Sequence, residues 1–305
     1  MIDAIHALVV TYNRRELLVQ NLAALAAQTY PLASITVIDN GSTDGTADAI
    51  RAMSNPLIEH VRLDPNIGAA RGFHYGIEYV FAKRAAPWAW IMDDDVIPSP
   101  TSLAELVAAY QRNFKQPDEI GFLVAQSVDA QGRANNVPTI DTRPRQLGEC
   151  AGWGQYLDQG MVSVRTSAIS AMLMPRSTYL TFGNLNPEFV VWGEDTDYTF
   201  RITEKRPGLL VGQSKIVHLR AQPGDISIFL EEDQRRVPNF YYLYRNSLYV
   251  RRRYVGMHAY VNGIVRGLVE ATRLAAAGKF KKANIALRGT AAGIVFNPKH
   301  VGPSV

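Results

Sequence analysis

The chain has 305 residues, 47% of them hydrophobic and 20% charged, with 23 glycines and 16 prolines, a composition that excludes disordered, collagen-like and coiled-coil proteins. A single cysteine, Cys150, excludes a secreted fold framed by internal disulfides. The formal net charge of +4 is uneven: residues 240–305 hold 11 basic residues and one acid (+10), and the rest holds 21 basic and 27 acidic residues (−6).

The first hundred residues alternate between strand and helix signals. Helical segments are expected between apolar runs that predict four buried strands, at residues 5–10, 35–38, 58–63 and 88–92. The first helix is expected to begin at a capping box formed by Asn13 and Glu16 and to end before Pro31. This β-α-β-α-β-α-β order predicts an open, mostly parallel α/β sheet with helices on both faces.

Polar clusters follow the predicted strands, at the sheet edge where ligands bind in folds of this type. The fourth strand ends in Asp93-Asp94-Asp95. Since side chains at i and i+2 of an extended segment point the same way, Asp93 and Asp95 are candidates to share one Mg²⁺ or Mn²⁺. A solvated acidic turn explains the same residues equally well.

Two polar segments near earlier strands are candidates for nucleotide binding. Asp39 ends the second strand, where a base or ribose is held by hydrogen bonds in such folds, and Asn66 and Arg71 flank the start of a helix, where a diphosphate binds. Ordinary turn chemistry is the alternative. The sequence matches neither a dinucleotide-binding nor a P-loop glycine motif.

The region from about 117 to 217 is less regular and contains two further candidates. Glu194-Asp195 follows Trp192 and opens a helical pattern, which indicates either a general base or ordinary capping by acids. A late strand is expected at 211–219, in which His218 is either a structural histidine or a metal ligand.

Taken together, five ordered motifs resemble family 2 glycosyltransferases with a GT-A fold. They are residues 9–13 (VVTYN), 37–44 (VIDNGSTD), 66–72 (NIGAARG), 92–95 (MDDD) and 193–197 (GEDTD). The resemblance covers about residues 5–220 and is strongest to bacterial galactofuranosyl- and rhamnosyltransferases. The triple aspartate favours the galactofuranosyl branch, because rhamnosyl relatives more often carry glutamine at the middle position; the Trp192 context and His218 lean the same way.

The resemblance implies a role for each matching residue. Thr11, Asn13, Asp39, Asn66, Arg71 and Asp94 would bind the nucleotide sugar, Asp93, Asp95 and His218 would bind Mn²⁺ or Mg²⁺, Asp195 and Glu194 would be catalytic, and Trp153 and Trp192 would frame the acceptor. Asp195 aligns with the family's catalytic base. Galactofuranosyl relatives tend to carry two adjacent aspartates here, whereas this chain has glutamate at the first position. The implied reaction is a single inverting displacement with a metal at the diphosphate.

The implied function is transfer of galactofuranose from UDP-galactofuranose to a glycan or lipid-linked saccharide in cell-surface polysaccharide synthesis, such as cell wall or O-antigen. A rhamnosyltransferase that uses dTDP-rhamnose is the alternative within the family, and a nucleotidyltransferase on a related sheet is another. A non-catalytic basic module that binds a membrane or nucleic acid is the alternative from a different class. Because the first strand begins at residue 5, we expect addition of one or a few sugars rather than processive polymerisation.

Two regions are expected. Residues 1–225 form the GT-A domain, with a nucleotide-sugar half at about 1–98 and an acceptor half at about 99–225, and residues 226–305 form a basic, amphipathic helical region. With neither a signal peptide nor about 18 uncharged apolar residues in a row, we expect a cytoplasmic protein. The basic region would dock on the inner membrane, near a polyprenyl-diphosphate-linked acceptor. Nucleic acid is not expected as a partner, and the oligomeric state stays open.

Overall fold

The computed structural model describes residues 2, 4–144, 151–219 and 226–303; Cys150 and the residues just before the predicted boundary at 225 lie outside this part. Its N-terminal half follows the predicted order. Four parallel strands lie in the order β3-β2-β1-β4, at Ile5–Thr11 (β1), Ser34–Asp39 (β2), Ile58–Arg62 (β3) and Trp88–Asp93 (β4). The connecting helices are α1 (Arg15–Ala26), α2 (Thr46–Ala52) and α3 (Ala69–Glu78).

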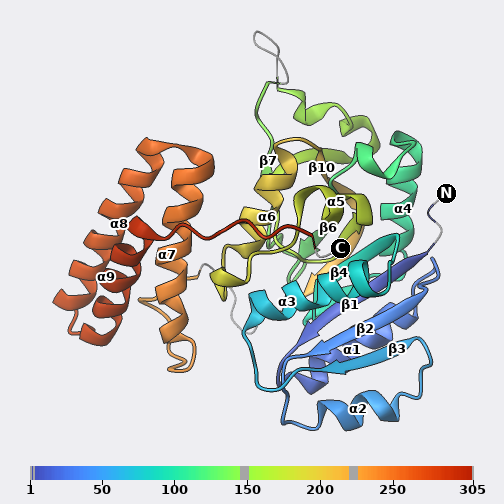
Figure 1. Cartoon of the computed structure of the whole chain (residues 1–305), viewed down its shortest axis with the longest axis horizontal. Helices are drawn as coiled ribbons and strands as arrows, with labels where there is room; N and C mark the ends of the chain where they lie inside the picture. Colours follow the sequence, from blue (N-terminus) through green and yellow to red (C-terminus); the bar gives the residue numbers. More distant parts are fainter. Residues whose placement is uncertain (1, 3, 145–150, 220–225, 304–305) are drawn as a thin grey trace.

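The apolar runs become strands because these strands are buried on both faces. In β1, Ala7 and Val9 point into one core cluster and Leu8 and Val10 into the other, and all four side chains are buried. The first cluster lies under α1 and α4 (Ser102–Asn113), and the second lies under α3, α5 (Arg176–Phe182) and α6 (Glu194–Thr203). Helices therefore cover both faces of the sheet (Figure 1).

The start of α1 differs from the prediction. Asn13 does not form a capping box with Glu16, because Arg14 occupies the N-cap position and Asn13 has a positive φ of 51°. Instead, Asn13 N donates to Ser42 Oγ (2.9 Å), and Asn13 Oδ1 accepts from Thr43 N (2.7 Å). Asn13 thus ties the loop after β1 to the loop after β2. The helix ends at Ala26, before Pro31, as predicted.

Beyond β4 the sheet becomes mixed, and the described strands run in the order β3-β2-β1-β4-β9-β6-β10-β8-β7, with β5 paired to β10. The added strands are β5 (Val96–Pro98), β6 (Phe122–Val128), β7 (Thr139–Ile140), β8 (Met161–Thr166), β9 (Met172–Pro175) and β10 (Gly208–His218). β6 and β10 are parallel, whereas β9 is antiparallel to β4 and β6. This antiparallel insertion was not predicted, because strands of two to four residues give little periodic signal.

The C-terminal helices form a separate layer beside the sheet (Figure 1). They are α7 (Phe240–Val250), the π-helical turn Arg251–Val255, α8 (Met257–Ala276) and α9 (Phe280–Val295), and they share a small core of their own. α7 and α9 approach closely at Gly289, where a Cβ would lie 2.6 Å from the carbonyl oxygen of Tyr241. Residues after α9 return to the sheet domain, where Asn186 Nδ2 donates to the carbonyl oxygen of Lys299 (2.8 Å). Within the described ranges, no helix is long and apolar enough to cross a membrane.

Candidate active site

Three of the predicted site residues meet at the carboxyl edge of the sheet. Asp93 ends β4, Asp95 follows it by two residues, and His218 ends β10; one ligand atom of each lies within 4.8 Å of the others. The antiparallel pairing of β5 with β10 causes this meeting, since it places His218 opposite Val96. His218 Nε2 lies 2.9 Å from Asp95 Oδ1, and its Nδ1 lies 2.7 Å from Asn136 Nδ2.

This cluster holds more negative charge than its protein partners neutralise. Burial, followed by the charges of Asp95 and Asp94, raises the pKa of Asp93 well above its usual value. Burial alone would raise the pKa of Asp95. The hydrogen bond to His218 and the charge of Arg14 outweigh burial, so the pKa of Asp95 lies below its usual value. Two carboxylates and one imidazole within 4.8 Å fit a divalent cation, which would relieve the repulsion at Asp93.

The middle aspartate faces the protein. Asp94 is 2% exposed and accepts hydrogen bonds from Thr11 Oγ1 (2.7 Å) and Arg14 Nη1 (3.1 Å). Arg14 also donates to Asp95 Oδ2 (2.8 Å). Burial raises the pKa of Asp94 to about 6, which Arg14 and Thr11 oppose. Thr11 and Asp94 therefore form a hydrogen bond with each other. Contact of either residue with a nucleotide stays a prediction. Arg14 was not among the predicted site residues. Its guanidinium pairs with Asp94 and Asp95 and so holds the acidic turn in place.

Asp39 is buried beneath the loop that follows β2. Its Oδ1 accepts from Ser42 N (2.7 Å), and its Oδ2 lies 3.0 Å from His60 Nε2 and 3.4 Å from Arg62 Nη1. Asp39 is 0% exposed. It thus shapes the loop that carries Ser42 and Thr43, and a direct contact with a base or ribose remains a prediction.

The loop before α3 is joined to this region through Asn40. Asn40 Oδ1 accepts from Ile67 N (3.0 Å), and Asn40 Nδ2 donates to the carbonyl oxygen of Gly68 (3.1 Å). The predicted residue Asn66 folds back, since its Oδ1 accepts from Gly68 N (2.8 Å). Arg71 is exposed in the first turn of α3. An exposed guanidinium at a helix N-terminus is suited to an anion, and contact of Arg71 with a diphosphate stays a prediction.

Glu194 and Asp195 are the first two residues of α6. Burial, together with the charge of Asp195, raises the pKa of Glu194 to about 8, and burial also raises the pKa of Asp195. Asp195 Oδ1 accepts from Thr196 N (2.6 Å), whereas Glu194 Oε2 is buried without a hydrogen-bond partner among the described residues. The charge of Glu194 also raises the pKa of Asp93, so the two acidic groups share one electrostatic environment.

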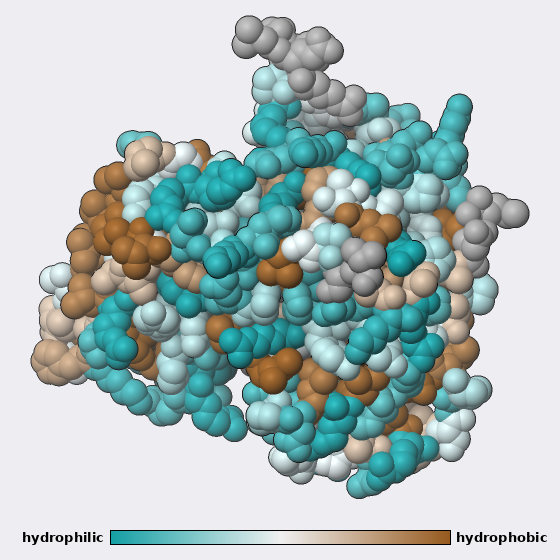
Figure 2. Space-filling model, in the orientation of Figure 1, coloured by the Kyte–Doolittle hydropathy of each residue, from teal (hydrophilic) through white to brown (hydrophobic). Residues whose placement is uncertain are grey.

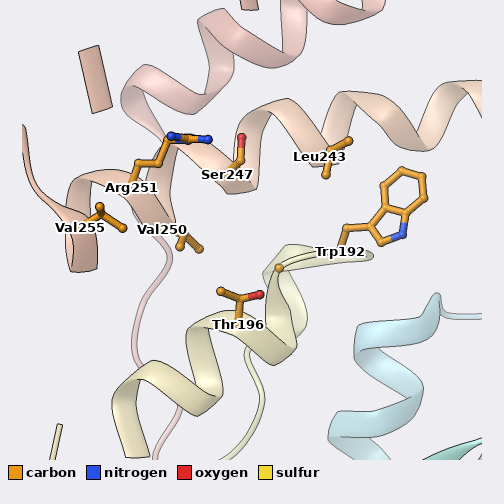
Figure 3. A pocket seen from close by; sticks show the side chains of 8 residues that line it. Trp192, Thr196, Leu243, Ser247, Val250, Arg251 and Val255 are labelled. Atoms are coloured by element: carbon orange, nitrogen blue, oxygen red, sulfur yellow. The ribbon is translucent and has the colours of Figure 1, made fainter. Parts of the chain in front are cut away.

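The two predicted acceptor tryptophans lie on different elements. Trp192 precedes α6 and packs edge-on against Phe240 of α7, with ring centroids 5.1 Å apart. Trp153 is 38% exposed, in the 3-10 turn Gly152–Gly154 that contacts β8. Trp192 borders a cavity of about 350 Å³ whose two sides are the start of α6 and α7 with its following turn (Figure 3). The lining residues are Trp192, Gly193, Thr196, Leu243, Ser247, Val250, Arg251 and Val255.

Four parallel strands flanked by helices, an acidic cluster after β4 and a half-buried carboxylate pair at the start of α6 together match a GT-A fold. Residues 7–118 match the sequence model of glycosyl transferase family 2, so this segment is similar to that family.

Two curated relatives are similar over part of the chain. Galactofuranosyltransferase GlfT1 of Mycolicibacterium smegmatis is 31% identical over 101 residues, which are 33% of this chain and 33% of that protein. Hyaluronan synthase of Streptococcus pyogenes is 27% identical over 139 residues, which are 44% of this chain and 31% of that protein. The chain thus spans about a third of the length of these relatives.

Solved structures share the fold at low sequence identity. TarS 1–349 of S. aureus in complex with UDP has a TM-score of 0.55 at 14% identity, covering 92% of this chain and 74% of that one. GalNAc-T7 with UDP, GalNAc and Mn²⁺ has a TM-score of 0.56 at 15% identity, covering 79% of this chain and 48% of that one. These similarities confirm the predicted fold class.

Proposed function

We propose that the protein is a metal-dependent, inverting glycosyltransferase that uses a UDP-sugar as donor. One observation carries the proposal: Asp93, Asp95 and His218 cluster at the carboxyl edge of the sheet, which is where ligands bind in open α/β folds. The fold-sharing structures with UDP, and in one case Mn²⁺, support this donor and metal class.

In the proposed reaction Asp195 is the general base. Its carboxylate takes the proton of an acceptor hydroxyl as that oxygen attacks the anomeric carbon, and the carbon–oxygen bond to the nucleoside diphosphate breaks on the opposite face. When bound at Asp93, Asp95 and His218, a divalent cation supplies Lewis-acid stabilisation of the diphosphate. Arg71, exposed in the first turn of α3, is proposed to contact the same diphosphate. Trp192 and Trp153 are proposed to contact the acceptor.

The proposed donor is UDP-galactofuranose, and the proposed acceptor is a glycan or lipid-linked saccharide of a cell-surface polysaccharide. The similarity to galactofuranosyltransferase GlfT1 supports this choice over dTDP-rhamnose. The nucleotide is the property that separates the two donors most directly, because UDP and dTDP differ in base and ribose.

Calorimetry with Mn²⁺ tests both the metal site and the nucleotide. We expect UDP to bind more tightly than dTDP, and we expect the Asp93→Ala/Asp95→Ala variant to lose at least about tenfold in UDP affinity, because a metal bridge to the diphosphate disappears. The exposed Asp158→Ala is the matched control. A dTDP preference would favour the rhamnosyl donor, and binding that does not depend on Mn²⁺ would refute the metal site.

We also propose that α8 and α9 dock on an anionic lipid surface at the cytoplasmic face of the inner membrane. Hydrophobic residues gather on the outer side of this helical layer, at the left of Figure 2. Large exposed apolar residues on these helices are Met257, Val261, Val265, Leu268, Val269, Phe280, Leu287, Ile294 and Val295. The exposed charges between them are all basic, at Arg266, Arg273, Lys281 and Arg288. An apolar face bordered by cations fits the interface of an anionic bilayer.

Liposome sedimentation of the full chain tests this docking. We expect binding to anionic vesicles that weakens as salt rises, because part of the attraction is a screened charge interaction. Val261→Ser/Val265→Ser should reduce the bound fraction severalfold, whereas Leu180→Ser, on the exposed side of α5, should not. A full chain that ignores anionic vesicles at low salt would contradict the proposal.

A further inference from the structure

The segment that leads into Glu194 and Asp195 adopts a backbone that its residue types disfavour. Val190 has φ 69° and ψ −57°, Trp192 has φ 61°, and Gly193 has φ 98°. At Val190 the chain makes a three-residue turn, in which Val191 N donates to the carbonyl oxygen of Phe189 (2.8 Å). A β-branched residue in this region persists only where the surrounding structure holds it.

The side chain of Asn246, on α7, makes several hydrogen bonds to this segment. Asn246 is 1% exposed, and its Nδ2 donates to the carbonyl oxygens of Phe189 (2.9 Å), Val191 (3.1 Å) and Trp192 (2.7 Å). Its neighbour Arg245 donates from Nε to Asn246 Oδ1 (2.9 Å), which fixes the orientation of the amide. The contact leaves little space, since a Cβ on Gly193 would lie 3.3 Å from Asn246 Cβ.

The opposite side of the segment touches the nucleotide-binding half. The carbonyl oxygen of Val190 accepts from Ala70 N (3.0 Å), in the first turn of α3, next to Arg71. Residues 189–193 therefore connect three elements: α3, α6 and α7. Movement of this segment would displace the start of α6, where Asp195 lies.

We infer that Asn246 is a positioning residue for the base, so that the C-terminal helical layer completes the active site. The inference rests on the proposed function of Asp195. The Asn246 amide donates to the carbonyl oxygens of Phe189, Val191 and Trp192. It therefore fixes the direction of the chain as it enters α6. Without that donor, three carbonyl groups lose a hydrogen bond and the segment is free to relax toward negative φ. Asp195 would then shift relative to Asp93, Asp95 and His218, which are held by other strands.

Steady-state kinetics of the full-length protein test the inference, with Asn246→Ala and Asn246→Asp as variants. The second keeps the shape of the side chain but removes the donating NH₂ group. We expect kcat to fall by about 10²-fold in both, the effect of moving a catalytic group by about 1 Å. The donor KM and the Mn²⁺-dependent affinity for UDP should stay within about twofold, because the metal-binding residues are untouched.

Two comparison variants make the result decisive. Asn113→Ala removes a helical asparagine amide on α4, outside the site, and should leave kcat unchanged. If the Asn246 variants do not fold, Arg245→Met replaces them in the test. It removes the donor to the carbonyl oxygens of Glu188 and Phe189 and should also lower kcat. Folded Asn246 variants with wild-type kcat, or with a loss confined to donor KM, would overturn the inference. An inactive wild-type protein would instead refute the proposed function.

Discussion

Replacing Asp195 with asparagine is expected to lower kcat by about 10²- to 10⁴-fold while leaving UDP binding intact. A general base contributes roughly 10² to 10⁴-fold to a rate, and the amide of asparagine cannot take the proton of the acceptor hydroxyl. Asparagine keeps an oxygen that can accept from Thr196 N, as Asp195 Oδ1 does now, so the start of α6 should be preserved. Transfer assays at saturating donor and acceptor, with calorimetry of UDP and Mn²⁺ on the same sample, measure both quantities.

The matched control for this variant is Asp158→Asn, an identical exchange at an exposed position in a 3-10 turn. It should retain the wild-type kcat. If Asp195→Asn kept more than about a tenth of the wild-type rate, Asp195 would not be the base. If UDP affinity fell together with kcat, the carboxylate would belong to the donor site instead.

The parallel half of the fold was predictable because its strands are buried on both faces. Alternate residues of β1 enter two different cores, so the strand appears in the sequence as an uninterrupted apolar run bounded by polar turns. The second half lacks this signal. β9 has four residues and β7 has two, and their antiparallel places in the sheet depend on pairing with strands far away in the chain.

Site residues that lie at or just after the ends of strands could be predicted from the sequence. Residues whose partners are backbone groups could not. Asp93, Asp95 and His218 gather because β4 and β10 end, and β5 begins, at one edge of the sheet. Asn246 is different, since its partners are carbonyl oxygens, which carry no residue identity. Asn13 shows the converse, because a pattern typical of a helix cap serves a contact between two loops.

A further effect is expected from Glu194→Gln, measured on stability rather than on rate. Burial and the neighbouring Asp195 raise the pKa of Glu194 from its ordinary 4.5 to about 8 in the folded protein. Between these two values the unfolded chain has released a proton that the native state retains, so this group makes native stability fall as pH rises. The decrease begins near pH 4.5 and levels off above about pH 8. Glutamine stays neutral throughout and removes this dependence.

The melting temperatures of metal-free wild type and Glu194→Gln should therefore differ more and more as the pH rises from 5 to 8. We expect the melting temperature of Glu194→Gln, relative to wild type, to rise by about 2–5 °C between those pH values. The measurement is made without Mn²⁺ because the charge of Glu194 also acts on Asp93. Glu204→Gln, at an exposed position in the turn after α6, is the control and should follow the wild-type curve. A constant difference between Glu194→Gln and wild type across this range would show that Glu194 is already ionised at pH 5. The carboxylate pair would then carry two charges in the resting enzyme, and the proton of the acceptor would be taken by a more basic site than a single aspartate provides.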